Sequence, residues 1–115
     1  MNAPTDTTAV IQAAIDEATA LAGQRPSMGE LAEVTDRLRA HIETLLPAAE
    51  AAAAGMWQGS RQWSALRWHL DGVRERAATD IEPRPFTAHV HVDALRRDCA
   101  WLLERYGPDH ERKDH

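Results

Sequence analysis

The sequence predicts an all-α protein, a small antiparallel bundle of about four helices. Through most of the chain the apolar residues recur every three or four positions, and they show no alternation with period two. Helix-start signals and helix-ending glycines or prolines divide this pattern into four segments. The 115 residues fit one domain, which we expect to cover residues 1–107, followed by a disordered polar tail at 108–115.

The first segment predicts a helix over about residues 8–22. Asp6, Thr7 or Thr8 can cap its start, and Gly23 ends it. Its apolar stripe, which we expect to face the core, consists of Val10, Ile11, Ala14, Ile15, Ala18 and Leu21.

The second segment has the clearest helix start and an internal interruption. Ser27 and Glu30 form the S-x-x-E pattern of a capping box, so the helix begins there. Pro47 lacks the amide proton that a helix uses and clashes with the preceding turn. We therefore expect this helix to be kinked or broken near Leu46 and to resume to residue 54. Its apolar stripe is Leu31, Val34, Leu38, Ile42 and Leu45.

Two further helices are predicted in the second half of the chain. Ser60 can cap a helix over about residues 61–78, and Thr87 can cap another that runs to about Tyr106. Their apolar stripes are Trp63, Leu66, Leu70, Val73 and Ala77, and then Val92, Leu95, Cys99, Leu102, Leu103 and Tyr106. Because the connections are short, consecutive helices are expected to lie antiparallel.

The four tryptophans are the most informative residues. At about 100° per residue, Trp68 points nearly opposite the apolar stripe of its helix, on the same side as Arg61. Trp101 lies far from the stripe of the last helix, near Val90. Such indoles are often packed under a neighbouring helix, but an exposed tryptophan beside arginine is typical of a binding hot spot. We expect Trp57 to close the end of the bundle. The predicted protein interface consists of Trp68, Arg61, Trp101 and Val90.

The charge balance disfavours nucleic acid as the main partner. The chain has 13 basic and 18 acidic side chains and a pI of about 5.6, whereas a DNA-binding domain usually has a basic stripe and a high pI. A small nucleic-acid-associated regulator is kept as the alternative function. It would use Arg61, Arg67, Arg74, Arg76, Arg96 and Arg97.

The sequence contains no complete catalytic or metal-binding motif, so we expect no enzymatic activity, no metal and no cofactor. His89 and His91 lie about 200° apart on a helix and cannot share a metal ion, and Cys99 falls on an apolar stripe as a buried, inert thiol. A third hypothesis is a ligand-binding or minor enzymatic bundle that uses His41 and Glu43 near the expected kink. It predicts a pocket beside the second helix.

Three segments between about residues 30 and 106 carry a family pattern. They read Leu38-Arg39-x-His41-Ile42-x-x-Leu45-Leu46-Pro47-x-x-Glu50, then His89-Val90, then Leu95 to Leu102-x-x-x-Tyr106. Together they resemble uncharacterised small helical proteins of actinobacteria that are labelled as associated with natural-product biosynthesis. The tryptophan-rich stretch 57–68 departs from that pattern. The resemblance implies an accessory or regulatory role and identifies no catalytic residue.

The sequence thus predicts a non-enzymatic module that binds another protein or a second copy of itself. The single cysteine indicates a reducing compartment, and residues 1–8 carry no secretory signal pattern. Because the chain also has no apolar run of about 18 residues, we expect a cytoplasmic protein without a membrane partner.

Overall fold

Four α-helices form the part of the chain that the computed structural model describes, namely the backbone of residues 3–107 and the side chains of residues 7–107. They are α1 (Ala3–Ala22), α2 (Met28–Ala54), α3 (Arg61–Ala78) and α4 (Pro85–Tyr106). The predicted all-α bundle of four helices is confirmed. The polar tail predicted at 108–115 lies outside the described residues.

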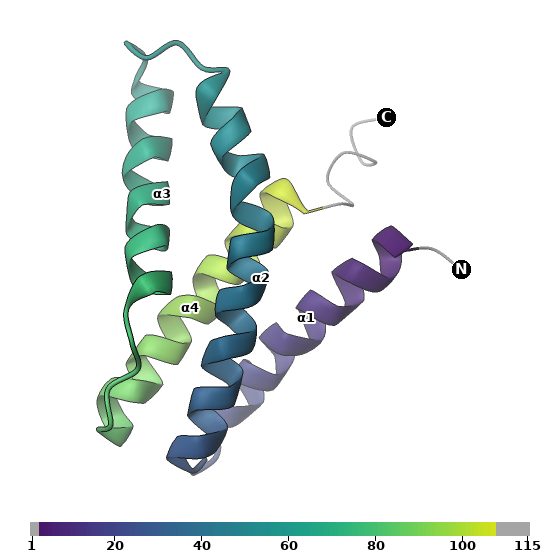
Figure 1. Ribbon diagram of the computed structural model, residues 1–115, viewed down its shortest axis with the longest axis vertical. Helices are drawn as coiled ribbons and strands as arrows, with labels where there is room; N and C mark the ends of the chain where they lie inside the picture. Colours follow the sequence, from purple (N-terminus) through teal and green to yellow (C-terminus); the bar gives the residue numbers. More distant parts are fainter. Residues whose placement is uncertain (1–2, 108–115) are drawn as a thin grey trace.

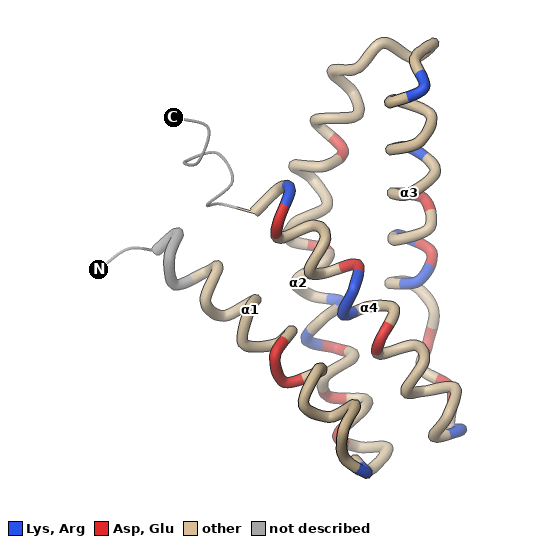
Figure 2. The backbone as a smooth tube through the Cα atoms, turned by 180° about the vertical axis from the view of Figure 1, so that it is seen from behind, with Lys and Arg blue, Asp and Glu red and all other residues tan. Residues whose placement is uncertain are grey.

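The helices are arranged around a central pair, α2 and α4. In Figure 1, α2 runs antiparallel to α1 and α3, and α4 crosses behind it. Figure 2 shows the same crossing from the other side. Among the described residues α4 contacts all three other helices, whereas α1 and α3 do not contact each other. The molecule measures 44 × 39 × 18 Å, so α3 lies at one edge of a flat body with one face unpacked.

The core combines the apolar stripes that the spacing predicts. All five stripe residues of α2 are buried, as are Leu70 of α3 and Leu102 of α4. Burial of each large side chain stabilises the fold by about 1.5–3 kcal/mol. Trp63 of α3 is an exception, since it is only half-buried and lies outside the core cluster. Val10 of α1 is another, since 58% of it is exposed. It lies at the border of its stripe, in the half of α1 that diverges from α2 in Figure 1.

Two of the predicted helix starts are confirmed by their caps. The Ser27 hydroxyl accepts a hydrogen bond from the Glu30 amide at 3.1 Å, and the Glu30 carboxylate accepts one from the Ser27 amide at 2.9 Å. The Ser60 hydroxyl accepts a hydrogen bond from the Trp63 amide at 3.1 Å. Such caps satisfy amides that have no partner inside the helix, and each stabilises it by about 1 kcal/mol.

The other two starts lie earlier than predicted. α1 begins at Ala3, so Thr7 and Thr8 are inside the helix. α4 begins at Pro85, and Thr87 is its third residue rather than its cap. Proline is favoured at the first helical position because its φ angle is already helical and the missing amide proton would have no partner there. The ring of Pro85 therefore starts this helix without a capping side chain.

Pro47 does not break α2, which continues as one helix from Met28 to Ala54. Of the two predicted outcomes, a kink or a break, the break is thus wrong. Both Pro47 and Glu43, the residue whose carbonyl loses its partner, are on the exposed side of the helix. Water can satisfy that carbonyl, while the opposite face of the same turns is held by the buried Leu45 and Ala49.

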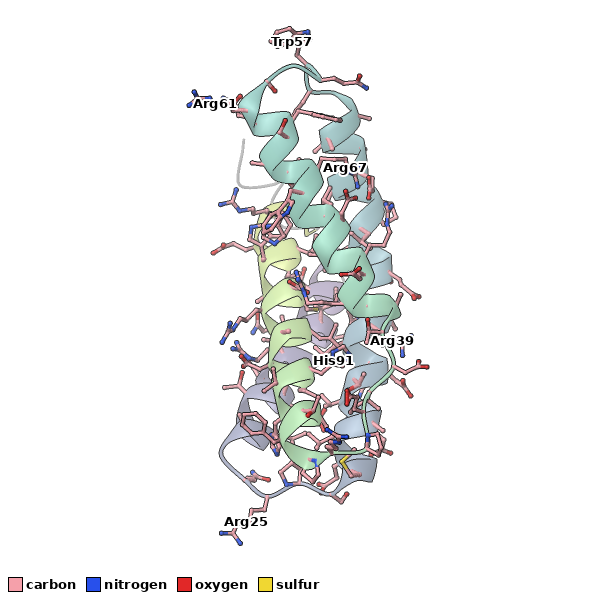
Figure 3. All side chains as sticks on the ribbon, turned by 90° about the vertical axis from the view of Figure 1, so that its left-hand side faces the viewer. Arg25, Arg39, Trp57, Arg61, Arg67 and His91 are labelled. Carbon is pink, nitrogen blue, oxygen red and sulfur yellow. The ribbon has the colours of Figure 1, made fainter. Side chains whose placement is uncertain are left out.

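Trp57 does not close the end of the bundle as predicted. It lies in the turn between α2 and α3 with 78% of its surface exposed, at the tip labelled in Figure 3. Its ring folds back over Gly59, where an added Cβ would lie 2.8 Å from two ring atoms. The turn is already closed by the Ser60 hydroxyl, which donates to the Trp57 carbonyl at 2.8 Å. The indole is therefore left outside.

Candidate functional site

α3 presents a complete helix face to solvent. Trp68 lies on this face, opposite the buried Leu70 and Val73, and 81% of it is exposed. Arg61 lies on the same face two turns earlier, about 10 Å away along the helix axis. The predicted outward direction of Trp68 is confirmed. Figure 3 views the molecule from this edge, with Arg61 near the tip.

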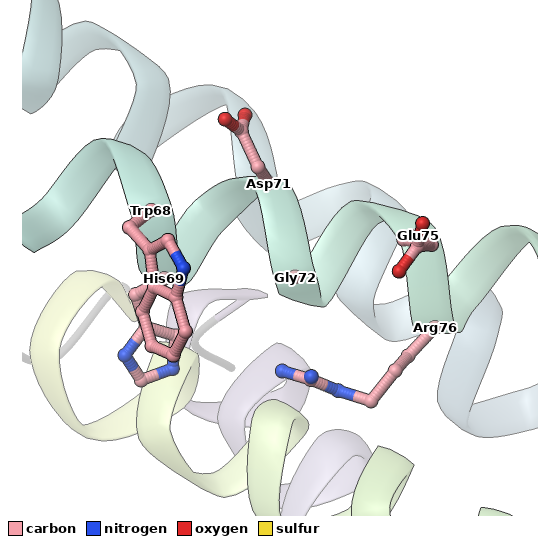
Figure 4. A pocket seen from close by; sticks show the side chains of 6 residues that line it. All are labelled: Trp68, His69, Asp71, Gly72, Glu75 and Arg76. Atoms are coloured by element: carbon pink, nitrogen blue, oxygen red, sulfur yellow. The ribbon is translucent and has the colours of Figure 1, made fainter.

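A hollow of about 460 Å³ lies beside the exposed indole (Figure 4). Gly72 follows Trp68 by one helical turn and lines the hollow without a side chain of its own. An added Cβ at Gly72 would come within 3.2 Å of the Arg76 guanidinium. α3 thus combines a projecting indole with a gap one turn away. The residues that line the hollow are Trp68, His69, Asp71, Gly72, Glu75 and Arg76.

Trp101 is not the uncovered indole that the sequence predicts, because α3 covers one of its faces. The His69 ring stacks on it with the centroids 3.9 Å apart and the planes 12° from parallel. The Tyr106 ring meets it edge-on at 5.7 Å, and the Arg105 guanidinium carbon lies 5.7 Å from its centroid. Trp101 is therefore half-buried. It lines a second hollow, of about 370 Å³, between α3 and the end of α4.

An ion pair between the buried Asp98 and the partly exposed Arg76 fixes α3 against α4 next to this stack. Asp98 is 6% exposed and accepts hydrogen bonds from Arg76 Nε at 2.7 Å and Nη2 at 2.9 Å. The Asp98 carboxylate raises the pKa of Arg76, which stays charged. Burial lowers the pKa of His69, with Arg76 and Arg105 acting in the same direction against Asp98. The ring that stacks on Trp101 is therefore neutral at pH 7.

Val90 does not join the other predicted interface residues. It is 54% exposed, but it lines a separate hollow of about 540 Å³ between α4 and the end of α1. The predicted surface therefore divides in two. Trp68 and Arg61 share the outward face of α3, with Trp101 beside it behind His69, and Val90 lies elsewhere.

The arginines proposed for nucleic acid are mostly compensated within the chain. Arg67 and Arg74 both pair with Glu50, and Arg76 pairs with Asp98. Asp93 forms salt bridges with both Arg96 and Arg97. In Figure 2 blue and red segments are accordingly interspersed along α3 and α4. Of the six arginines only Arg61 takes part in no ion pair with a described residue, so no basic stripe is formed.

The third hypothesis predicts a pocket at His41, and a hollow of about 280 Å³ does lie there, between α1 and α2. Its lining is Thr7, Val10, Ile11, His41 and Thr44. Glu43 is exposed and does not line it, so no carboxylate accompanies the imidazole. Burial, together with the positive charge of Arg37, lowers the pKa of His41. The hollow therefore contains His41 without the Glu43 carboxylate that the hypothesis places beside it.

The described residues contain no group of three or more histidine, cysteine or acidic side chains that could hold a metal ion. Cys99 is fully buried, and burial raises the pKa of its thiol to about 12. The thiol is therefore protonated and unreactive at pH 7. Within the same part of the chain, no helix has both the length and the apolar character to span a membrane.

Two residues of this surface are not apparent from the sequence. His69 covers Trp101, and Gly72 opens the hollow beside Trp68. The position of Gly72 one turn after a tryptophan is a sequence signal for such a gap. The partner of His69 follows only from the way α3 crosses α4.

A comparison with protein-family models identifies one match. The model described as a family of unknown function (DUF6415) matches residues 7–111, which include almost all of the four helices. The curated proteins and the solved structures give no significant match to the chain. Because the family model covers most of the sequence, the protein belongs to the DUF6415 family.

Proposed function

We propose that the protein is a non-enzymatic interaction module that binds a protein partner through the outward face of α3. The observation that carries this proposal is the 81% exposure of Trp68 in the middle of a regular helix. An indole has about 150–250 Å² to bury, and a partner that covers it gains the corresponding hydrophobic free energy.

The surroundings of Trp68 support the same function. The hollow beside Gly72 offers a partner a concave contact, and Arg61 offers a guanidinium without an internal ion pair among the described residues. Tryptophan and arginine are the residue types most enriched in binding hot spots. Trp101 lies behind His69 and lines the neighbouring hollow, and its stack with His69 keeps it in a defined orientation.

The proposed setting follows the sequence resemblance. We propose an accessory or regulatory protein of an actinobacterial cytoplasm, associated with natural-product biosynthesis. A reducing cytoplasm is compatible with the one free, buried thiol of Cys99.

The proposal is tested by affinity capture from the source organism with the tagged wild-type chain, a Trp68→Ala variant and a Trp57→Ala control. Both indoles are about four-fifths exposed, so the two variants remove equal apolar surface. We expect Trp68→Ala to weaken association by about 2 kcal/mol, about 30-fold in dissociation constant, and Trp57→Ala to leave it unchanged. Urea unfolding of each variant monitors the fold. Equal capture by wild type and Trp68→Ala would contradict the proposal, as would an unfolded Trp68→Ala chain.

A further inference from the structure

The outward face of α3 carries four residues in one line, at spacings of seven, four and three. They are Arg61, Trp68, Gly72 and Glu75. At about 100° per residue they fall within one narrow sector opposite the buried stripe of the helix. No other described helix covers this sector, since Arg61, Trp68 and Glu75 are all exposed. The line is therefore available along most of the length of α3.

The charges at the two ends of this line are opposite, and the Glu75 carboxylate also acts electrostatically on its neighbour Arg76. The other ionised side chains of α3 are engaged, such as Arg67 with Glu50 and Asp71, and Arg76 with Asp98. Arg61 near the start and Glu75 near the end take part in no ion pair with a described residue. A binding face with a positive end and a negative end is electrostatically complementary to an identical face laid antiparallel to it.

The shape of this face is also complementary to an identical face laid antiparallel to it. Trp68 projects from the helix, and the hollow at Gly72 lies one turn further along. If a second α3 is laid antiparallel across the first, each Trp68 meets the Gly72 hollow of the other helix. With the two-fold axis at position 70, Arg61 lies opposite position 79 of the other helix, which is four residues, or about 6 Å along the axis, from Glu75. The register that seats the indole therefore leaves the two charges about one turn apart, a gap that the long Arg61 and Glu75 side chains can bridge.

We propose that α3 docks antiparallel on α3 of a second copy of this chain, with the Trp68 indole of each copy in the hollow beside Gly72 of the other. This inference rests on the proposed function and names the partner. Such a contact is isologous, because the same patch is used by both copies and the assembly closes as a dimer. The two ends of the dimer interface are joined by Arg61 of each copy and Glu75 of the other.

The dimer is expected to be weak and concentration-dependent. Two crossed helices bury less than about 1,200 Å² in total, the range of transient complexes. The net charge of −5 adds repulsion between copies, which salt near 0.15 M screens beyond about 8 Å. Sedimentation equilibrium of the full chain, from about 1 μM to about 1 mM in such salt, spans the dissociation constants expected for this class.

Two variants test the shape of the contact. Trp68→Ala removes the projecting indole and Gly72→Leu fills the hollow with a strong helix former. Because a Cβ at Gly72 lies 3.2 Å from the Arg76 guanidinium, urea unfolding of the Gly72→Leu monomer checks that α3 remains packed on α4. We expect each to raise the dimer dissociation constant at least tenfold. Trp57→Ala and Ala20→Leu are the matched controls, since both positions are exposed and lie outside the line. A dimer that tolerates Trp68→Ala and Gly72→Leu, or that the controls weaken equally, would overturn the proposal.

Charge reversal tests the two-fold arrangement. Arg61→Glu and Glu75→Arg are each expected to weaken the homodimer about threefold. An equimolar mixture of the two variants should form a heterodimer as tight as the wild-type dimer, because every crossed pair is then again of opposite charge. A mixture as weak as the single variants would refute the antiparallel register.

The outcomes separate this inference from the proposed function. A chain that stays monomeric to about 1 mM overturns the second copy as partner. If Trp68→Ala then still abolishes capture of a different protein, the interaction module stands with another partner. If both the dimer and the capture are insensitive to Trp68→Ala, both proposals fail.

Discussion

Replacing Asp98 by asparagine tests how α3 is held against α4. Asp98 is the most deeply buried carboxylate among the described residues, and its two hydrogen bonds to Arg76 measure 2.7 and 2.9 Å. Asparagine has the same shape but no charge. The change therefore removes the acceptor charge and one of the two hydrogen bonds, because the amide nitrogen cannot accept, while leaving the packing of α4 intact.

The magnitude follows from the exposure of the two partners. Breaking a fully buried ion pair costs about 3–5 kcal/mol, largely because the remaining charge is stranded. Here the Arg76 side chain is 40% exposed, so its guanidinium can turn to water once the carboxylate is gone. The asparagine oxygen also retains one hydrogen bond, of about 1 kcal/mol. We expect Asp98→Asn to lower the free energy of unfolding by about 2 kcal/mol.

The assay is urea unfolding of wild type, Asp98→Asn, Arg76→Met and the double variant. The double-mutant cycle should yield a coupling energy of about 1–2 kcal/mol. Asp93→Asn is the matched control, because Asp93 also pairs with arginines but its side chain is 34% exposed and both partners are on its own helix. It should cost less than about 1 kcal/mol. A loss below about 0.5 kcal/mol for Asp98→Asn, or a coupling energy near zero, would refute this account.

Three further predictions concern single residues. Pro47→Ala should raise the free energy of unfolding by about 1–2 kcal/mol in urea, because alanine restores an amide hydrogen bond inside an unbroken helix; a loss of stability would contradict this. The pKa of His69, followed by NMR titration, should lie below its ordinary value of 6.5 because the ring is desolvated against Trp101. The contribution of His69 to stability is therefore fully present above pH 6.5 and is lost as the pH falls from 6.5 through the lower pKa of the folded protein. A pKa above 6.5 in the folded protein would reverse this pH dependence. Cys99 should resist thiol reagents at pH 8 in the native protein and react at once in urea, since burial raises its pKa to about 12; rapid native labelling would show that α4 opens.

Most of the fold is predictable because helix formation depends on neighbours in the chain. The capping box of Ser27 and Glu30 marks the start of α2 within one residue, and Ser60 does the same for α3. These signals act over three positions and need no tertiary contact. The sequence offers two possible starts for α4, namely a cap at Thr87 and a first helical residue at Pro85. The helix begins at Pro85, although Thr87 is also a suitable capping residue.

The candidate site was predictable only in part. The spacing of α3 places Trp68 outside, and the structure leaves it 81% exposed. By the same spacing Trp101 also points away from its stripe, yet His69 covers it at 3.9 Å. Two indoles that both point away from their stripes thus have different surroundings, because α3 crosses α4 at Trp101. The sequence of α4 alone does not predict this crossing.

The sequence by itself determined the four helices, their buried stripes and the outward direction of Trp68, since each depends on a period of 3.6 residues and on capping over one turn. Only the tertiary structure decided that α3 lies at the edge of a flat body, that Arg76 reaches Asp98, and that Val90 is separated from Trp68. Those outcomes depend on the angle at which rigid helices cross. That angle is set by the packing of side chains from all four helices at once, which no single stretch of sequence encodes.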